Sequence, residues 1–332
     1  MPDRIPTGPA APATAARNSA MAMRYWLVLL SIGTAFGASF AFNAVLLHSY
    51  GPLTVSTLRV AIGAAGCWAF VLATGRRRTL TGVGFAGIAI LGVFQFAAPF
   101  AILPLAQQHV TSSTAGIANA LTPVATVLVA HFWPGGERAT AAKLWGCALG
   151  VAGIALLTMR GAEAGGSDPR FVLVALAAPF CYGIALNFVR RFAGLDPVVL
   201  IAWAMTGGAL AIAPVALSVE GLPAMPDLQA AAALVTIGIG LTSATFIAMY
   251  SILPAVGATN LSLVTFVAPI SATFLGVLAF GEALGLHQLG GMALILAGLL
   301  TIDGRLLRAL VHRRAVTMPI REPGAFETER LS

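Results

Sequence analysis

Long apolar stretches alternate with short polar breaks along almost the whole chain. A membrane-spanning helix needs roughly 20 mostly apolar residues. The breaks carry turn residues, such as Gly51-Pro52 and Pro134-Gly135. The pattern predicts ten transmembrane helices, at about residues 25–47, 53–73, 82–104, 111–133, 142–159, 170–190, 197–219, 228–250, 257–280 and 284–304.

The composition supports a membrane protein and excludes a soluble one. Of the 332 residues, 58% are hydrophobic and 9% are charged, whereas soluble domains carry about 25% charged residues. The net charge of +7 fits basic loops on one side of a membrane, and no motif for nucleic-acid binding accompanies it. The cysteines (Cys67, Cys147 and Cys181) lie in apolar stretches without metal-ligand spacing, so we predict neither a metal site nor a cofactor.

The positions of Lys and Arg orient the predicted helices, because positive residues gather in cytoplasmic loops. With a cytoplasmic N-terminus, the outside segments hold only Arg160 and Arg170 of the 19 Lys and Arg residues, and Arg59 lies within a span. An even number of spans then puts both termini in the cytoplasm. Residues 1–24 are predicted to be a disordered cytoplasmic tail and residues 305–332 a second cytoplasmic tail.

The two halves of the chain match at an offset of 145 or 146 residues. The anchors, which occur in the same order in both halves, are Pro52 and Pro197, Pro123 and Pro269, Glu137 and Glu282, Gly146 and Gly291, and Gly153 and Gly298. Each copy, residues 25–160 and 170–304, holds five spans. Because five is odd, the second copy enters the membrane from the opposite side. The sequence therefore predicts an all-α membrane protein of two inverted five-helix repeats, with substrate bound between them near the bilayer midplane, as in secondary transporters.

The stretch STAGIANALTPVATVLVAHFWPGGER, residues 113–138, and the glycine-rich span that follows it resemble the EamA-type domain of the drug/metabolite transporter superfamily. Arg59, seven residues after Pro52, fits the same pattern. The resemblance covers residues 25–304 as two EamA domains and is greatest to amino-acid and metabolite exporters. One departure is Phe36-Gly37, where the family usually has Trp-Gly. The resemblance implies a carrier of the inner (plasma) membrane that moves a small metabolite by facilitated or proton-linked exchange.

Arg59 is the strongest single candidate for function. An Arg within a span costs at least about 2.5 kcal/mol on insertion scales, so it should face the bundle interior or a water-filled cavity. One interpretation is that Arg59 attracts a carboxylate of the substrate. Alternatively, it ties helices together through backbone carbonyls, or it extends toward one membrane surface.

Other polar residues in the spans are candidates for lining a substrate site, because each needs a partner in the hydrocarbon region. Ser39 and Asn43 lie one turn apart on one side of the first span. Asn119 lies one turn before Pro123, whose ring leaves a carbonyl unpaired, so it either lines the cavity or repairs the helix. The predicted substrate-binding residues are Ser39, Asn43, Arg59, Gln95, Asn119, Tyr182, Asn187 and Tyr250.

Pro123 and Pro269 occupy matching mid-span positions and are predicted hinges for alternating access, with a static kink as the alternative. Glu137 and Glu282 are expected at opposite membrane faces, where they pair with loop groups or cap the next helix. No Asp or Glu lies at mid-span, so we do not expect a carboxylate within the membrane to carry protons.

The chain carries no residue pattern typical of an enzyme, neither a phosphate-binding loop nor a His-Glu-x-x-His or Cys-x-x-Cys motif. The favoured function is export of a small organic solute, such as an amino acid, by a monomer whose partners are that solute and membrane lipid. A lipid flippase on the same fold and a membrane sensor or scaffold without flux are the alternatives.

Overall fold

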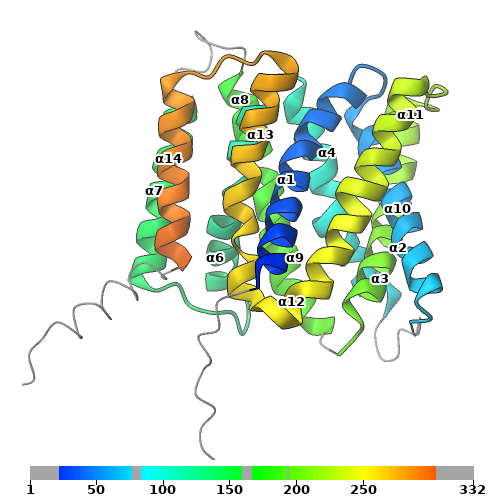
Figure 1. The fold of residues 1–332 in the computed structure, drawn as a ribbon, viewed down its shortest axis with the longest axis horizontal. Coiled ribbons are helices and arrows are strands. Elements are labelled where there is room, and N and C mark those ends of the chain that lie inside the picture. Colours follow the sequence, from blue (N-terminus) through cyan, green and yellow to red (C-terminus); the bar gives the residue numbers. More distant parts are fainter. Residues whose placement is uncertain (1–21, 77–83, 159–166, 193, 304–332) are drawn as a thin grey trace, which may run out of the picture.

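The protein, seen in a computed structural model, is a bundle of long helices that run side by side between two end faces (Figure 1). The expected tails lie outside the described residues, apart from residues 22–24. The structure describes residues 22–76, 84–158, 167–192 and 194–303.

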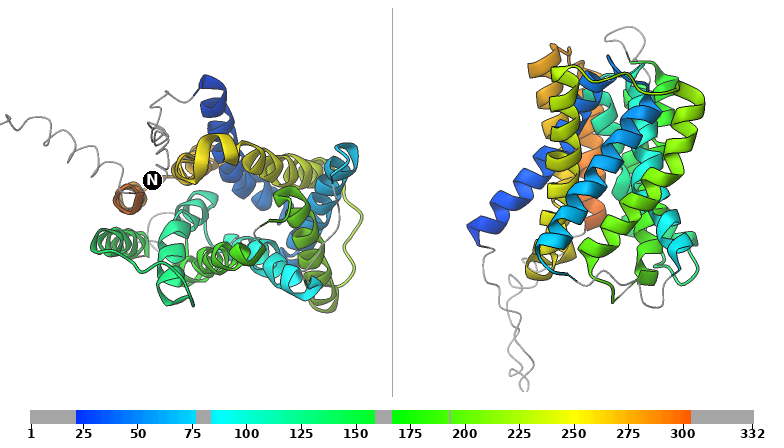
Figure 2. Two further views of the ribbon diagram at one scale, coloured as in Figure 1. Left: turned by 90° about the horizontal axis from the view of Figure 1, so that it is seen from below. Right: turned by 90° about the vertical axis from the view of Figure 1, so that its right-hand side faces the viewer.

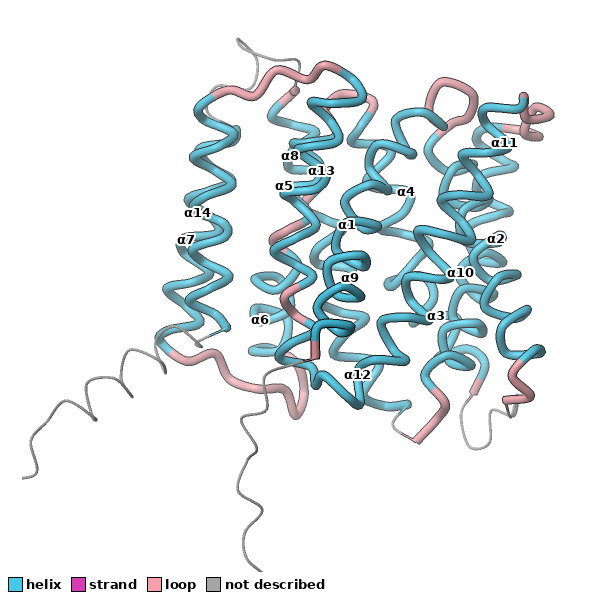
Figure 3. Tube along the Cα trace, viewed as in Figure 1, coloured by secondary structure: helices cyan, strands magenta, loops and turns pink. Residues whose placement is uncertain are grey.

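The first five spans form repeat 1. They are α1 (Met23–Leu46), α2 (Pro52–Ala73), a third span of α3 (Phe85–Gly92), η1 (Val93–Ala97) and α4 (Ala98–Gln107), a fourth span of α5 (Ser112–Asn119) and α6 (Thr122–Phe132), and α7 (Ala141–Thr158). The chain turns at Ala120–Leu121 between α5 and α6 (Figure 3).

The next five spans form repeat 2. They are a first span of α8 (Pro169–Ala175), α9 (Ala177–Phe188) and η2 (Val189–Phe192), then α10 (Pro197–Glu220), a span of α11 (Leu228–Val235), η3 (Thr236–Ala244) and α12 (Thr245–Leu261), α13 (Val264–Phe280) and α14 (Leu286–Asp303).

The described residues contain the ten predicted spans. Eight helical segments are long and apolar enough to cross a membrane, and two shorter apolar helices, Ala141–Leu157 and Val264–Phe280, complete the set. Two predicted boundaries were wrong. Residues 251–256 were assigned to a loop and residues 257–261 to the ninth span, whereas α12 continues to Leu261 and α13 begins at Val264. The prediction ended the eighth span at the length that is needed to cross a bilayer, but the helix continues beyond that length.

Proline and aspartate define several helix starts. Pro197 is the first residue of α10, where its missing N–H is tolerated. The side chain of Asp196 accepts hydrogen bonds from the backbone N–H groups of Val198 and Val199. Asp227 caps α11 in the same way through Ala230 N–H at 2.7 Å. These caps satisfy backbone donors that a helix leaves free at its N-terminus.

Helix packing follows the symmetry of the two repeats. The first span of repeat 1, α1, packs on α13 of repeat 2, and the first span of repeat 2 packs through α9 on α6 of repeat 1. The second spans, α2 and α10, pack on each other, as do the fifth spans, α7 and α14, which stand together at one edge of the bundle (Figures 1 and 2). Equivalent spans of the two predicted repeats therefore make equivalent contacts with the other repeat.

Glycines allow the close approach of α7 and α14. A Cβ atom at Gly153 would lie 2.7 Å from the carbonyl oxygen of Gly291, and one at Gly146 would lie 2.6 Å from that of Gly298. Both distances are too short for a methyl group. Small residues let membrane helices pack with their backbones in contact, so these glycines serve packing within one chain.

The third span of each repeat contains a π-helical segment, η1 in repeat 1 and η3 in repeat 2. Such widened turns are rare in proteins as a whole, and those that occur often lie at functional sites. In η3 the hydroxyl of Thr242 donates to the carbonyl of Ile237, five residues earlier. In η1 the carbonyl of Ala97 accepts a hydrogen bond from Ser56 on α2 at 2.9 Å. Side-chain hydroxyls thus satisfy backbone carbonyls of both segments.

The bundle has two end faces that differ in charge. The one at the bottom of Figure 1, here the basic face, is where α1 begins, α2 ends and α6 connects to α7, and where η2 lies. The basic residues in and next to these described segments are Arg24, Arg76, Arg138, Lys143, Arg190 and Arg191. The other, here the opposite face, is formed by the connections at residues 47–51, 108–111, 221–227 and 281–285.

Candidate substrate cavity

A cavity of about 210 Å³ lies in the centre of the bundle. Its lining residues come from α1, α2, η1, α4, α5 and α6 of repeat 1 and from α9, α12 and α13 of repeat 2, so both repeats contribute to it. Its polar lining consists of Ser39, Asn43, Arg59, Gln95, Asn119, Thr122, Tyr182 and Thr265. Among the described residues that line it there is no Asp or Glu, so the Arg59 guanidinium is its one formal charge.

The structure brings together most of the predicted site residues. Ser39, Asn43, Arg59, Gln95, Asn119 and Tyr182 all line this central cavity. Two do not. Tyr250 lines a neighbouring cavity that shares Gln95 and Leu186 with the central one. Asn187 lines neither, because its amide donates to the carbonyls of Gly183 and Thr126 and so ties α9 to α6.

Arg59 is 3% exposed and forms part of the cavity wall. Its Nε donates a hydrogen bond of 2.9 Å to the hydroxyl of Thr242 on η3. Its guanidinium carbon lies 3.7 Å from the ring centroid of Phe100 on α4, which is within the range of a cation–π contact. Among the described residues its hydrogen-bond partner is therefore a side chain and not a backbone carbonyl, and the side chain does not extend to either face.

Two buried amide oxygens in the cavity wall, Asn43 Oδ1 and Asn119 Oδ1, have no hydrogen-bond partner among the described residues. The Asn43 side chain is fixed on its other side, because its Nδ2 donates to Gln107 Oε1 at 3.1 Å. Buried polar atoms nearly always have partners. These two oxygens are therefore unsatisfied acceptors buried in the cavity wall.

Asn119 and Thr265 occupy equivalent positions in the two repeats, each four residues before a matched proline, and both line the cavity. Pro123 cannot donate to the carbonyl of Asn119, and the Thr122 hydroxyl donates to it instead at 2.7 Å. The helix is thus repaired by Thr122, which leaves the Asn119 side chain free to face the cavity. Pro123 is the second residue of α6, directly after the break, whereas Pro269 lies inside α13.

Aromatic rings form the apolar part of the wall. Phe246 on α12 packs against Phe36 at 5.6 Å and against Phe96 at 5.1 Å between ring centroids, and Phe96 contacts Phe100. Phe36, Phe40, Phe100 and Phe246 line the central cavity. Edge-to-face packing of this kind fixes the rings relative to one another.

Polar contacts close the bundle between the cavity and the opposite face. The Glu282 carboxylate accepts hydrogen bonds from the backbone N–H groups of Ser112 and Ser113 and from the Ser113 hydroxyl. Below them, Gly116 on α5 is so close to α13 that a Cβ atom would lie 2.4 Å from the Cβ of Ala272. Repeat 2 is thereby bound to the start of α5.

Two roles were expected for Glu282, pairing with loop groups or capping the next helix, and its contacts fit neither. It caps α5, which belongs to repeat 1, because the connection before α14 folds over the start of α5. The matched residue Glu137 pairs with a side chain of the next helix, α7, and not with a loop group: Lys143 Nζ lies 2.6 Å from its Oε1. That hydrogen bond lowers the pKa of the Glu137 carboxyl.

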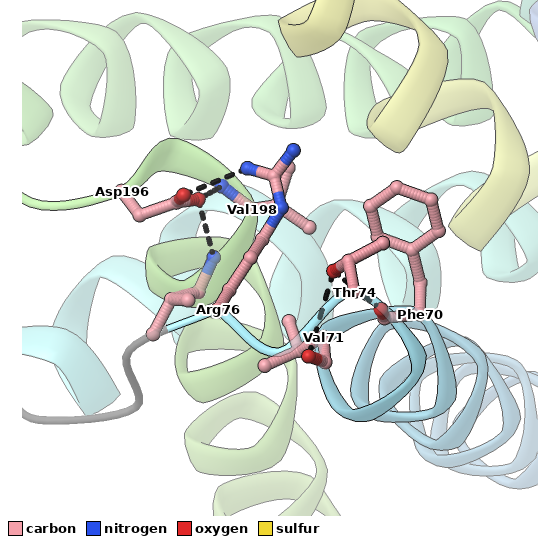
Figure 4. A network of polar contacts seen from close by, with 7 residues as sticks. Phe70, Val71, Thr74, Arg76, Asp196 and Val198 are labelled. Atoms are coloured by element: carbon pink, nitrogen blue, oxygen red, sulfur yellow. Dashed lines mark hydrogen bonds and ion pairs between the residues drawn. The ribbon is translucent and has the colours of Figure 1, made fainter.

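Helices α2 and α10 are fastened to each other at both ends. At the basic face Arg76 Nη1 lies 2.7 Å from Asp196 Oδ2, and the same carboxylate caps α10 (Figure 4). At the opposite face the Glu220 carboxylate accepts hydrogen bonds from Leu53 and Thr54 N–H, at 2.9 and 2.8 Å. The helix that carries Arg59 is therefore fixed to repeat 2.

Sequence reasoning missed Thr242, Phe100, Phe246 and Thr265. The available signal for Thr242 was the run Gly-Leu-Thr-Ser at residues 240–243, which places two neighbouring hydroxyls at mid-span close to a glycine. Thr265 is at the repeat position of Asn119 and is found by applying the offset to that residue. The aromatic rings carry no separate signal, because lipid-facing and cavity-facing Phe look alike in sequence.

Comparison with protein families matches the EamA-like transporter family to residues 23–159 and to residues 170–302. Three curated relatives span the same region. The probable terminal-alkyne amino-acid exporter of Streptantibioticus cattleyicolor is 26% identical over 89% of this chain and 97% of its own length. The uncharacterized transporter YoaV of Bacillus subtilis is 24% identical, over 83% and 96%.

The third relative, an uncharacterized transporter of Archaeoglobus fulgidus, is 23% identical over 83% of this chain and 98% of its own length. A solved crystal structure at 23% identity superposes with a TM-score of 0.61 and covers 86% of this chain and 98% of that chain. The two molecules share a fold.

Proposed function

Because the chain belongs to the EamA-like transporter family, we propose that it exports a small solute bearing a carboxylate, such as an amino acid or a related metabolite. The observation that carries this proposal is the uncompensated guanidinium of Arg59 in a cavity without acidic residues among its described lining. A buried cation without a partner carboxylate is costly. A carboxylate on the solute supplies the missing charge.

The other groups of the cavity match the ammonium group and the side chain of an amino acid. The partnerless oxygens of Asn43 and Asn119 accept hydrogen bonds and therefore complement an ammonium group, whereas they offer nothing to a second carboxylate. The rings of Phe36, Phe40 and Phe246 provide an apolar surface for a side chain. Pockets of this kind use a few placed polar groups for orientation and apolar walls for affinity.

The proposed direction is outward. The basic face carries nearly all described Arg and Lys residues outside the spans, which supports a cytoplasmic location for that face and for both termini. The neighbouring cavity reaches from Gln95 to Phe192 and Pro197 near the basic face. At the opposite face, the hydrogen bonds from Ser112 and Ser113 to Glu282 close the bundle. This state is proposed to load solute from the cytoplasm of the cell, across its inner (plasma) membrane.

Alternating access then requires the contact between α5 and α13 to open and its inner counterpart to close. We propose that Pro123, next to the break at Ala120–Leu121, and Pro269, at the matched position of α13, are the hinges. The carrier is proposed to act as a monomer, since the glycines of α7 and α14 are used within one chain.

A flux assay in proteoliposomes tests the proposal. Purified protein is reconstituted and preloaded with each of the 20 standard amino acids, and counterflow of the labelled compound is measured, with nucleosides, sugars and a fluorescent phospholipid analogue as further probes. We expect saturable counterflow of one or more amino acids in the wild type and none in Arg59→Ala. Exchange of the lipid analogue alone, or of no compound, contradicts the proposal.

A further inference from the structure

The π-helix determines which group receives the proton of the Thr242 hydroxyl. Its Oγ1 donates to the carbonyl of Ile237 at 2.7 Å, five residues earlier. In α-helices of this protein threonine hydroxyls donate three or four residues back, as those of Thr265 and Thr57 do. Because a hydroxyl has a single proton, Thr242 Oγ1 has only lone pairs left to offer. It is therefore an acceptor for the N–H of Arg59.

Glycines on α2 hold η3 against the helix that carries Arg59. A Cβ atom at Gly63 would lie 3.2 Å from the methyl group of Thr242, and one at Gly66 would lie 2.6 Å from the hydroxyl of Ser243. Thr242 itself is fully buried. The position of its oxygen is thus set by backbone packing between α2 and η3 and not by a flexible side chain.

The guanidinium of Arg59 is constrained on one edge and one face. Thr242 takes the Nε–H, and the ring of Phe100 covers one face at 3.7 Å. The edge formed by the two terminal nitrogens is left without a hydrogen-bond partner among the described residues. A guanidinium edge with two parallel N–H groups matches a carboxylate in a bidentate manner.

We infer that Thr242 is a positioning residue that turns the terminal edge of Arg59 toward the substrate and so sets the preference of the cavity for carboxylates. The inference rests on the proposed function for the identity of the ligand. Without the Thr242 hydroxyl, Arg59 is free to rotate and to point Nε–H into the cavity, and its two terminal nitrogens are then no longer presented together.

Three variants separate this role from repair of the π-helix. Thr242→Val keeps the shape and removes the hydroxyl, whereas Thr242→Ser keeps the hydroxyl. Thr245→Val is the matched control, because Thr245 is also buried and also donates five residues back, to the carbonyl of Gly240 at 3.0 Å, but does not contact Arg59. If the substitutions acted only by damaging η3, Thr242→Val and Thr245→Val would both lose transport activity.

Transport of L-leucine and of L-leucinamide is the first readout, since the amide lacks only the anionic group. We expect Thr242→Val to raise KM for leucine about tenfold, the loss of one hydrogen bond to a charged group. KM for leucinamide should stay the same, so that the preference for the acid falls by the same factor. Thr242→Ser should restore the preference for leucine over leucinamide, and Thr245→Val should leave that preference unchanged. Equal loss for both probes, or equal loss in Thr245→Val, overturns the inference.

A second readout does not depend on the substrate. Phenylglyoxal modifies arginine side chains, and peptide mass spectrometry reports its rate at Arg59. We expect Thr242→Val to raise that rate about fivefold, the population change for one net hydrogen bond, with no change in Thr245→Val. Absence of amino-acid flux in the wild type would refute the proposed function, whereas an unchanged modification rate in Thr242→Val would refute the positioning role.

Discussion

Glu282→Gln tests whether one carboxylate keeps the cavity closed toward the opposite face. Glu282 accepts hydrogen bonds from Ser112 N at 2.7 Å and Ser113 N at 3.0 Å, and from the Ser113 hydroxyl. All three donors belong to repeat 1, and the acceptor belongs to repeat 2. The residue also places a negative charge at the N-terminus of α5, where the helix dipole favours an anion.

The size of the effect follows from these contacts. Gln has the same shape, but it is neutral, and its NH₂ group cannot accept the hydrogen bonds that the second carboxylate oxygen accepts. Loss of the charge and of one or more bonds should cost about 1–2 kcal/mol. If opening breaks these bonds, the ratio of opened to closed molecules rises about 5–30-fold.

Accessibility of the cavity from that face provides the assay. Ser39 lines the cavity, so Ser39→Cys, in a background free of native cysteines, is labelled in intact cells with a membrane-impermeant maleimide. Glu282→Gln should raise the labelling rate by the factor given above, and Glu137→Gln, which removes only the contact to Lys143, should not. A folded Glu282→Gln protein that labels at the parental rate would refute the reasoning.

Two other predictions concern stability. Asn187→Ala removes the amide that ties α9 to α6 and should lower stability by about 1 kcal/mol in thermal unfolding, with KM unchanged; a raised KM at an unchanged melting temperature would instead place Asn187 in the binding site. Gly153→Ala puts a methyl group 2.7 Å from the Gly291 carbonyl and should destabilise the fold by about 1–3 kcal/mol. Gly240→Ala, which enters open space, is its control, and equal melting of the two variants would contradict the packing argument.

The spans and the repeat were predictable because both depend on local pattern. Apolar length gives the helices, and matched residues such as Pro123 and Pro269 give the offset. Arg59 and Asn119 could be selected because polar groups are costly in a membrane. Their orientation toward the cavity could not, because it depends on which side of each helix meets a neighbour.

Tertiary contacts account for what sequence did not reveal. Residues Thr242 and Ser243 of η3 pack against Gly63 and Gly66, which lie far away in the chain. Glu282 finds its partners 169 and 170 residues away, so no rule based on the next helix could have identified them. The eighth span was cut short because bilayer thickness sets a minimum length for a helix and not its end.

The bond between Arg59 and Thr242 has a consequence for biosynthesis, since it joins positions 183 residues apart. Arg59 leaves the ribosome with the second span, whereas its partner emerges with the eighth. During that interval the charged side chain is in the translocation channel or the lipid without its final hydrogen bond. Insertion of the second helix must therefore be supported temporarily by water, lipid headgroups or Phe100 of the following span, and the first repeat completes its structure only after most of the second has been made.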